Sequence, residues 1–195
     1  MIAILAGAAV GVATAYWAVD GFGDHGAPTR AYSVGNGVWS GDLAVGSAAA
    51  NPFTRARIAK RGLLALSREE AIYFFRDRDE NGERFRGDCI YKMSGGALPA
   101  EWWSVTLYDD DDFLTQNDDN AHSINSFTLA DANADWSAMI GSTDQRADAL
   151  WLSTRNAGAF SLTLRLYQPY REALDNPNAI AYPSIERLHC MGGTK

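Results

Sequence analysis

A long segment without any charged residue opens the chain, running from Ile2 to Val19. As an α-helix it would extend about 27 Å at roughly 1.5 Å per residue, which is close to the thickness of the hydrocarbon core of a bilayer. Tyr16 and Trp17 stand near its C-terminal end, and amphipathic rings of this kind prefer the membrane–water interface. The segment therefore predicts one transmembrane anchor helix over residues 1–20, surrounded by the lipid bilayer.

Two other interpretations of this segment are open. Ala13-Thr14-Ala15 resembles the small-x-small site at which a signal peptide is cleaved, and a buried helix of a soluble protein is the second alternative. No basic residue precedes the apolar run, and the run continues past the cleavage-like site, so we expect an uncleaved anchor. Asp20 and Asp24 follow it, which weakly favours an N-terminus inside the cell and a domain outside.

Small residues recur at every fourth position of this segment, at Ala3, Gly7, Gly11 and Ala15. On a helix this spacing forms one flat stripe, which a second helix can approach closely. Alanine and glycine are common in apolar segments, so the spacing alone is a weak signal. Because a solitary anchor gains nothing from a flat stripe, we expect these positions to pack against the helices of integral membrane partner subunits.

The chain has two cysteines, Cys89 and Cys190. A zinc site would need more ligands, and His189 is the adjacent candidate. Two unrelated buried thiols are another alternative. In an oxidising compartment the pair predicts one disulfide. Its loop of about a hundred residues would stabilise the fold by roughly 4–5 kcal/mol in the chain-entropy model.

The composition is that of a globular domain, with 47% hydrophobic and 11% aromatic residues. The net charge is −7, which argues against a nucleic-acid-binding protein because such proteins present a basic face. It also argues against attachment to anionic lipid headgroups by charge alone. We therefore expect an acidic domain in a bulk aqueous compartment.

After the anchor, residues 21–50 are rich in glycine, alanine and serine and predict an extended connector with one edge strand. Asn51-Pro52 starts a predicted short helix that ends at Lys60. Ser67 and Glu70 form a capping-box pattern, yet the aromatic residues after it favour a strand. Alternation predicts a strand at 102–108. Further short strands, separated by Asp, Asn and Gly, are predicted at 85–93, 123–129, 136–140, 149–152 and 160–167. Residues 51–195 therefore predict one β-sandwich or barrel domain.

Several motifs of this region together resemble the DUF1214 family, a bacterial domain family of unknown function. They occur in order at 77–82 (D-x-D-x-N-G), 87–91 (Gly-Asp-Cys-x-Tyr), 98–109 (beginning Leu-Pro-Ala-Glu-Trp-Trp), 160–169 and 183–188. The resemblance covers residues 51–190 and implies a jelly-roll-like β-sandwich behind an N-terminal hydrophobic segment. We therefore expect a mainly β chain with one transmembrane helix and one or two short helices. The resemblance implies no activity.

The chain departs from the family pattern at two places. The family usually carries Asn-Trp-Leu-Pro where this sequence has Leu-Trp-Leu-Ser at 150–153. It carries an Arg-Tyr-Ser-like segment where this sequence has Ala-His-Ser at 121–123. If the family has a ligand site near those strands, this chain lacks part of it.

Asp77, Asp79, Asn81 and Asp88 follow the spacing of an EF-hand calcium loop. Alternate oxygens of such a loop converge on one ion. The last ligand here is Asp rather than the usual Glu, and flanking helices are not evident. A hairpin turn uses the same residue types, so calcium is the weaker interpretation, and we expect no other cofactor.

Carboxylates also gather at Asp109–Asp112 and, with asparagines, at 117–120. Adjacent carboxylates repel, so they are solvated in a hairpin loop or neutralised by a cation or a basic partner. The neighbouring Trp102 and Trp103 lie on opposite faces of a predicted strand, so one faces the core and the other faces out. We expect Trp102, Asp109 and Asp111 to contact a partner or a ligand such as a sugar.

The sequence has no G-x-S-x-G elbow, no H-E-x-x-H pair, no phosphate-binding loop and no dinucleotide fingerprint. We therefore expect a non-catalytic accessory subunit of a bacterial inner-membrane complex, with its β-domain in the periplasm. Respiratory, photosynthetic and transport complexes are all candidate hosts. The alternative is a membrane-tethered module that binds carbohydrate or lipid. A hydrolase is a further alternative.

Overall fold

The computed structural model describes residues 2–20, 33–43, 66–129, 134–146 and 150–191, with separate positions between 45 and 59 and position 131. Its elements in chain order are α1 (Ile2–Asp20), β1 (Ser33–Gly35), β2 (Ser40–Asp42), β3 (Ala71–Arg76), β4 (Cys89–Gly95), β5 (Ala100–Asp109), β6 (Ser123–Asn125), η1 (Ser126–Thr128), β7 (Trp136–Gly141), β8 (Leu150–Ser153), β9 (Phe160–Pro169), α3 (Arg171–Asp175), η2 (Pro177–Ala179) and β10 (Ser184–Cys190).

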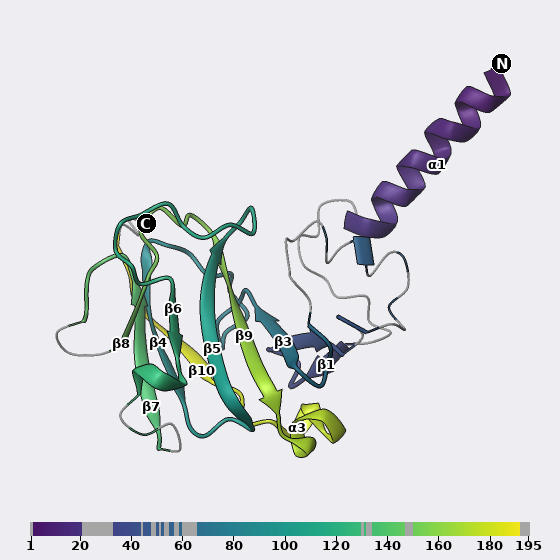
Figure 1. Cartoon of the computed structure of the whole chain (residues 1–195). Coiled ribbons are helices and arrows are strands. Elements are labelled where there is room, and N and C mark those ends of the chain that lie inside the picture. Colours follow the sequence, from purple (N-terminus) through teal and green to yellow (C-terminus); the bar gives the residue numbers. More distant parts are fainter. Residues whose placement is uncertain are drawn as a thin grey trace.

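The strands form two sheets (Figure 1). One sheet has six strands in the order β1-β2-β3-β9-β5-β6, and the other has four in the order β10-β4-β7-β8. The described pairs are antiparallel except β7 and β8, which run parallel. The prediction of a mainly β chain with few helices is confirmed. The parallel pair is a departure from a jelly roll, which is antiparallel throughout.

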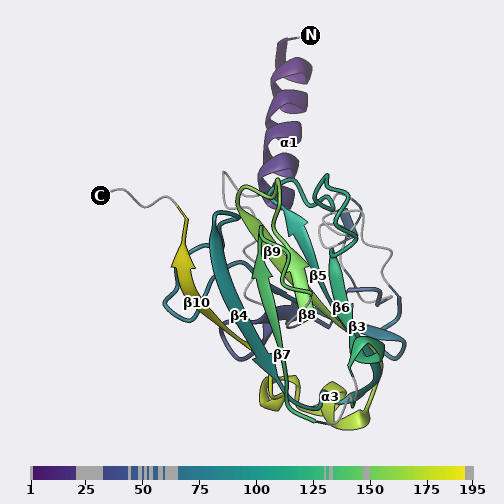
Figure 2. The ribbon, with the colours of Figure 1, turned by 90° about the vertical axis from the view of Figure 1, so that its left-hand side faces the viewer.

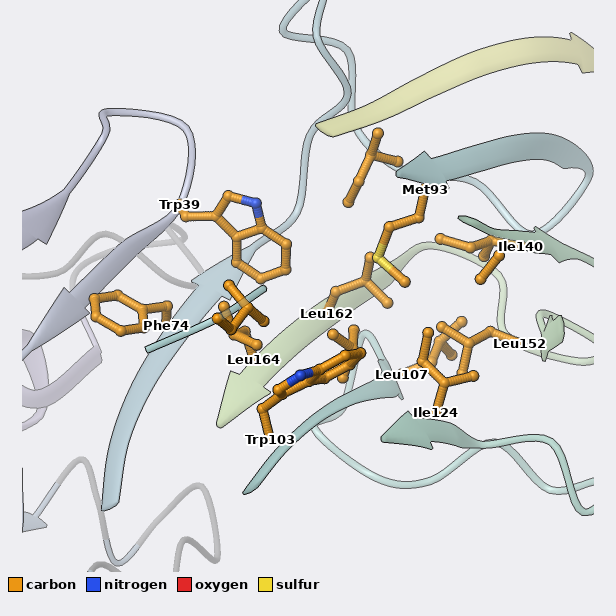
Figure 3. Close-up of a cluster of buried hydrophobic side chains, with 14 of the residues drawn as sticks. Trp39, Phe74, Met93, Trp103, Leu107, Ile124, Ile140, Leu152, Leu162 and Leu164 are labelled. Atoms are coloured by element: carbon orange, nitrogen blue, oxygen red, sulfur yellow. The ribbon is translucent and has the colours of Figure 1, made fainter. Parts of the chain in front are cut away.

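One hydrophobic core lies between the two sheets (Figure 3). Alternation along β5 points Trp103, Val105 and Leu107 into it, and alternation along β9 adds a row of three leucines. Burying each such side chain contributes roughly 1.5–3 kcal/mol. The four-stranded sheet supplies the facing side chains, among them Tyr91, Met93, Ala138, Ile140, Leu152 and Ile185. The alternation predicted for 102–108 and the strand predicted at 160–167 are therefore confirmed.

Trp39 shows that the predicted connector takes part in the folded domain. Its side chain is fully buried in the core, and its indole N–H donates to the carbonyl of Pro183 at 2.8 Å. On either side of it, β1 and β2 extend the six-stranded sheet beside β3. Residues 21–32 of the connector lie outside the described residues.

Other predicted elements are confirmed or shifted. The capping-box contact at Ser67 forms, because its backbone N–H donates to the carboxylate of Glu70 at 3.1 Å, but it closes a single turn before β3. The strand predicted at 85–93 begins later, at Cys89, and the strand predicted at 123–129 ends at Asn125, where η1 begins. The helix predicted over 51–60 lies largely outside the described residues, and its described positions are helical.

The N-terminal segment forms helix α1, which stands away from both sheets (Figures 1 and 2). No helix among the described residues is both long enough and apolar enough to cross a membrane. The predicted transmembrane anchor over 1–20 is corrected accordingly. Its many alanines and its two glycines present little apolar surface per residue.

The predicted disulfide between Cys89 and Cys190 is present. It joins the first residue of β4 to the last residue of β10, which are partners in the register of that strand pair. Because β10 is the outer strand of its sheet, the bond fastens a sheet edge. Cys89 itself is buried in the core.

Tyr182 gives the core a predicted dependence on pH. Its ring contacts Trp39 and Phe74, and its hydroxyl donates to the carbonyl of Pro177 at 2.9 Å. Burial raises the pKa of Tyr182 above its ordinary value. The neutral phenol is therefore favoured in the fold, and this stability is complete below about pH 10, where an unfolded tyrosine ionises, and is lost as the pH rises further.

We expect urea unfolding to show a lower free energy of unfolding at pH 11 than at pH 8. The free energy of unfolding of Tyr182→Phe should fall less between pH 8 and pH 11. At pH 8 this variant should be less stable than the wild type by about 1 kcal/mol, because it lacks the hydrogen bond. Tyr170→Phe, at an exposed position, is the control and should follow the wild type. Equal losses in Tyr182→Phe and the wild type would contradict the assignment.

Candidate binding face of the six-stranded sheet

The outward face of the six-stranded sheet carries the polar and aromatic half of the alternating pattern. Along β5 the outward positions are Trp102, Ser104, Thr106 and Tyr108, and along β9 they are Ser161, Thr163, Arg165 and Tyr167. The register places these residues in rows across the two strands. The prediction that one of Trp102 and Trp103 faces out is confirmed, because Trp103 is buried in the core and Trp102 is partly exposed.

Three rings on this face form what we call the aromatic cluster: Trp102, Phe127 and Tyr167. Trp102 pairs with Tyr167 across the strands, and their ring centroids lie 4.7 Å apart. Phe127 flanks the other side of Trp102 at 6.1 Å. Tilted contacts at these distances each stabilise the pair by about 0.5–1.5 kcal/mol beyond the area they bury. The rings therefore hold one another in place.

Phe127 is the most exposed large apolar side chain described in the folded domain, at 85%. It is held by the one-turn helix η1 rather than by a loose loop. The backbone N–H of Phe127 donates to the Asn125 side chain at 2.9 Å, and Thr128 accepts the N–H of Asn125 at 3.2 Å. This reciprocal cap fixes the backbone, so an exposed ring is presented on a rigid support.

Arg165 is the cation at the centre of this face. Its guanidinium donates to the Tyr108 hydroxyl at 2.7 Å and lies 5.4 Å from the centroid of that ring. No carboxylate partner of Arg165 is found among the described residues. Burial raises the pKa of Tyr167, and the positive charge of Arg165 acts in the opposite direction. The face is thus neutral apart from one guanidinium.

The small-residue stripe of α1 is a second bare surface. Gly7, Gly11 and Ala15 are exposed, and a Cβ added at either glycine would meet nothing within 4 Å. The backbone of Ala3 is helical, but its side chain lies outside the described residues. Nothing described in the chain covers this stripe, and its predicted packing contact stays a prediction.

The residues predicted to bind calcium are engaged in ion pairs instead. Asp79 accepts the backbone N–H groups of Asn81 and Glu83 through one oxygen, and its other oxygen lies 2.7 Å from the Arg187 guanidinium. Asp77 lies near Arg78 and Arg84, and a hydrogen bond from Arg86 lowers the pKa of Asp88. In the part of the chain that is described, no group of three or more His, Cys, Asp or Glu side chains could hold a metal ion.

Behind this turn lie two ion pairs, Arg76–Glu80 and Asp79–Arg187, each with one buried partner. Arg76 lies inside the core, 3.0 Å from Glu80 and 5.9 Å from the centroids of the Trp39 and Phe85 rings. Burial lowers the pKa of Arg76, and its hydrogen bond to Glu80 opposes that effect. Glu80 also accepts the backbone N–H of Ile185 at 2.9 Å. The turn is therefore a clamp on β10 and not an ion-binding loop.

The acidic loop after β5 lies at the opposite end of that strand from Trp102. Asp109 accepts the backbone N–H groups of Asp111 and Phe113 at 3.0 and 2.9 Å, and Asp110 pairs with Arg84 at 3.0 Å. Asp109 therefore organises the turn, and Asp111 is exposed. The predicted contact set of Trp102, Asp109 and Asp111 is not brought together.

The two places where the chain departs from its family pattern meet in the fold. The backbone N–H of Ser153 donates to the carbonyl of Ala121 at 2.9 Å, a bond that proline could not make. The Ser153 hydroxyl donates to Asp119, which also pairs with Arg155 at 2.8 Å. Ser153 is fully buried, so its hydroxyl closes a structural contact between the edges of the two sheets.

The model of the DUF1214 family, described as a protein of unknown function, matches residues 70–171. The chain belongs to this family. The DUF1214 match runs from the turn before β3 to the first residue of α3, so it contains the aromatic cluster and Arg165. No curated protein matches the chain at a significant level.

Two solved structures are similar to the chain. The VPA0106 protein from Vibrio parahaemolyticus is 26% identical, with a TM-score of 0.56 over 70% of this chain and 35% of its own. A putative uncharacterized protein from Burkholderia cenocepacia is 12% identical, with a TM-score of 0.45 over 61% of this chain and 30% of its own. The chain thus spans about a third of the length of these two proteins.

Proposed function

We propose that this chain is a non-catalytic accessory subunit of a bacterial inner-membrane protein complex, such as a respiratory, photosynthetic or transport complex. Its β-domain lies in the periplasm, and α1 packs against the helices of the partner subunits. The observation that carries the proposal is the uncovered apolar surface of α1.

The large side chains of α1 have no cover within the described chain. Ile4, Leu5, Val10 and Val12 are between 63% and 76% exposed. Covering such a side chain is favourable by about 1.5–3 kcal/mol, so the helix gains when another apolar surface meets it. The bare glycines permit a close approach between the backbone of α1 and the backbone of a partner helix.

The disulfide supports the periplasmic assignment, because such bonds persist in oxidising compartments and are rare in the cytosol. A scaffold role is supported by the polar clusters of the domain. The buried carboxylates Asp79 and Asp119 and the hydroxyl of Ser153 are all bonded to other protein groups. These bonds stabilise turns and sheet edges rather than exposing a reactive group.

The stripe of α1 can be tested by adding bulk to it. Gly7→Leu and Gly11→Leu are expected to reduce the amount of partner protein that co-purifies in mild detergent by about tenfold, because a leucine keeps the helix backbones apart. Ala9→Leu adds the same bulk on the opposite side of the helix and should leave co-purification unchanged. Equal recovery of partners with all three variants would contradict docking through the stripe.

A further inference from the structure

We propose that the aromatic cluster of Trp102, Phe127 and Tyr167, together with Arg165, forms a binding site for an uncharged oligosaccharide on the outward face of the six-stranded sheet. The site is separate from α1 and goes beyond the accessory role, since it gives the periplasmic domain a ligand of its own.

The ring geometry fits the apolar side of a sugar. The face of an aromatic ring is negatively polarised and attracts weakly positive C–H groups, which a pyranose presents on one side. Trp102 lies between the other two rings, with centroid distances of 4.7 Å to Tyr167 and 6.1 Å to Phe127. Three adjoining rings make a platform longer than one sugar ring, so the site suits an oligosaccharide rather than a monosaccharide.

The platform is already in place before any ligand arrives. Phe127 sits on the capped turn of η1, and the other two rings stand on paired central strands. A rigid platform loses little conformational entropy on binding. Phe127 is 85% exposed, so covering it with a ligand removes the most apolar surface from water of the three rings.

The polar groups on the same face match hydroxyl groups. Arg165 keeps donors beyond the one used for Tyr108. Thr106, Tyr108 and Asn125 are partly exposed on the same face, and their hydroxyl and amide groups both donate and accept. Sugar hydroxyls also do both, so a saccharide lying on the rings can satisfy its polar edge there.

The face disfavours two other classes of ligand. β9 lies between β3 and β5, so its backbone offers no free ladder to an extended peptide, whose own amides would lack partners there. The chain carries a net charge of −7, which repels anionic polymers at long range. An uncharged, hydroxyl-rich ligand fits both constraints.

Calorimetric titration of the full chain, kept in a detergent without a sugar headgroup, tests the site. The probes are cellotetraose and maltotetraose, which differ in linkage, and trigalacturonate as the charged comparison. We expect one of the two neutral probes to bind with a Kd of about 1 mM or tighter. Trigalacturonate should bind more weakly than that probe.

Side-chain variants on this face locate the binding. Phe127→Ala is expected to raise the Kd of the neutral probe about fivefold or more. Arg165→Gln should raise this Kd as well. Phe113→Ala removes another exposed ring, from the acidic loop, where Phe113 is 67% exposed, and should change the Kd by less than about twofold.

Each other outcome overturns the proposal. If neither neutral probe releases or absorbs heat at millimolar concentration, oligosaccharides are excluded as the ligand class. If trigalacturonate binds as tightly as the better neutral probe, the preference for uncharged sugars is wrong. Binding that survives Phe127→Ala places the sugar elsewhere. These results leave the α1 proposal untouched, because partner co-purification is measured separately.

Discussion

Arg187→Leu is expected to lower the free energy of unfolding by about 3 kcal/mol, because it leaves a buried carboxylate without its counter-charge. The Asp79 side chain is fully buried, whereas the Arg187 side chain is 24% exposed. The guanidinium also lies 5.9 Å from the Tyr91 ring centroid, and this contact is lost too. The partial exposure of Arg187 keeps the expected loss at the lower end of the range for buried pairs.

Urea unfolding monitored by tryptophan fluorescence would measure this loss. Arg86→Leu is the matched control, since Arg86 pairs with Asp88 at the exposed surface, and its unfolding midpoint should not change. Asp79→Asn separates charge from turn formation, because the amide oxygen still accepts the two backbone N–H groups. It should lose less stability than Asp79→Leu. If Arg187→Leu unfolds at the same urea concentration as the wild type, the Asp79–Arg187 ion pair does not hold β10.

Replacing Cys89 and Cys190 together with serine is expected to lower the free energy of unfolding by about 5 kcal/mol. The bond closes a sequence separation of 101 residues, and the chain-entropy model gives about 4.7 kcal/mol for a loop of about this length. Serine at the buried position of Cys89 adds a smaller polar cost. Without the bond, the outer strand β10 is still held by its ladder, by the buried Ile185 side chain and by the contacts of Glu80 and Asp79 with Ile185 and Arg187.

The measurement compares urea midpoints of the wild type with and without a thiol reductant. The oxidised wild type should be more stable than the reduced one, and the reductant should not affect the double serine variant. The reduced wild type and the variant should have similar midpoints. An oxidised midpoint equal to the reduced one would contradict a stabilising role for the bond.

Local patterns predicted much of this fold because they depend on near neighbours. Trp102 and Trp103 could be assigned to opposite faces, although not which faced the core, because alternation is a property of any strand. The pairing of Cys89 with Cys190 followed from there being no other thiol. The capping pattern at Ser67 and Glu70 was also recognisable, but the strand-forming residues after it decided the outcome.

Long-range contacts explain what the sequence did not predict. The turn at 77–82 has the composition of a calcium loop, and only the return of β10 brings Arg187 to Asp79 and makes it a clamp. Trp39 lies in a stretch of small residues, and nothing local indicates that its indole fills the core. Phe127 was predicted within a strand, and its exposure depends on the cap that starts η1. One signal was available: Asn125 and Thr128 have the spacing of a cap.

The size of the native assembly tests the central claim most directly. Membranes of cells that produce the chain would be solubilised in mild detergent, and the mass of the assembly containing the chain would be measured by native mass spectrometry. Docking through α1 predicts a stable complex with larger membrane subunits, and the loss of that complex in Gly7→Leu but not in Ala9→Leu. Recovery of the wild-type chain only as a free species of 21.2 kDa would contradict the account.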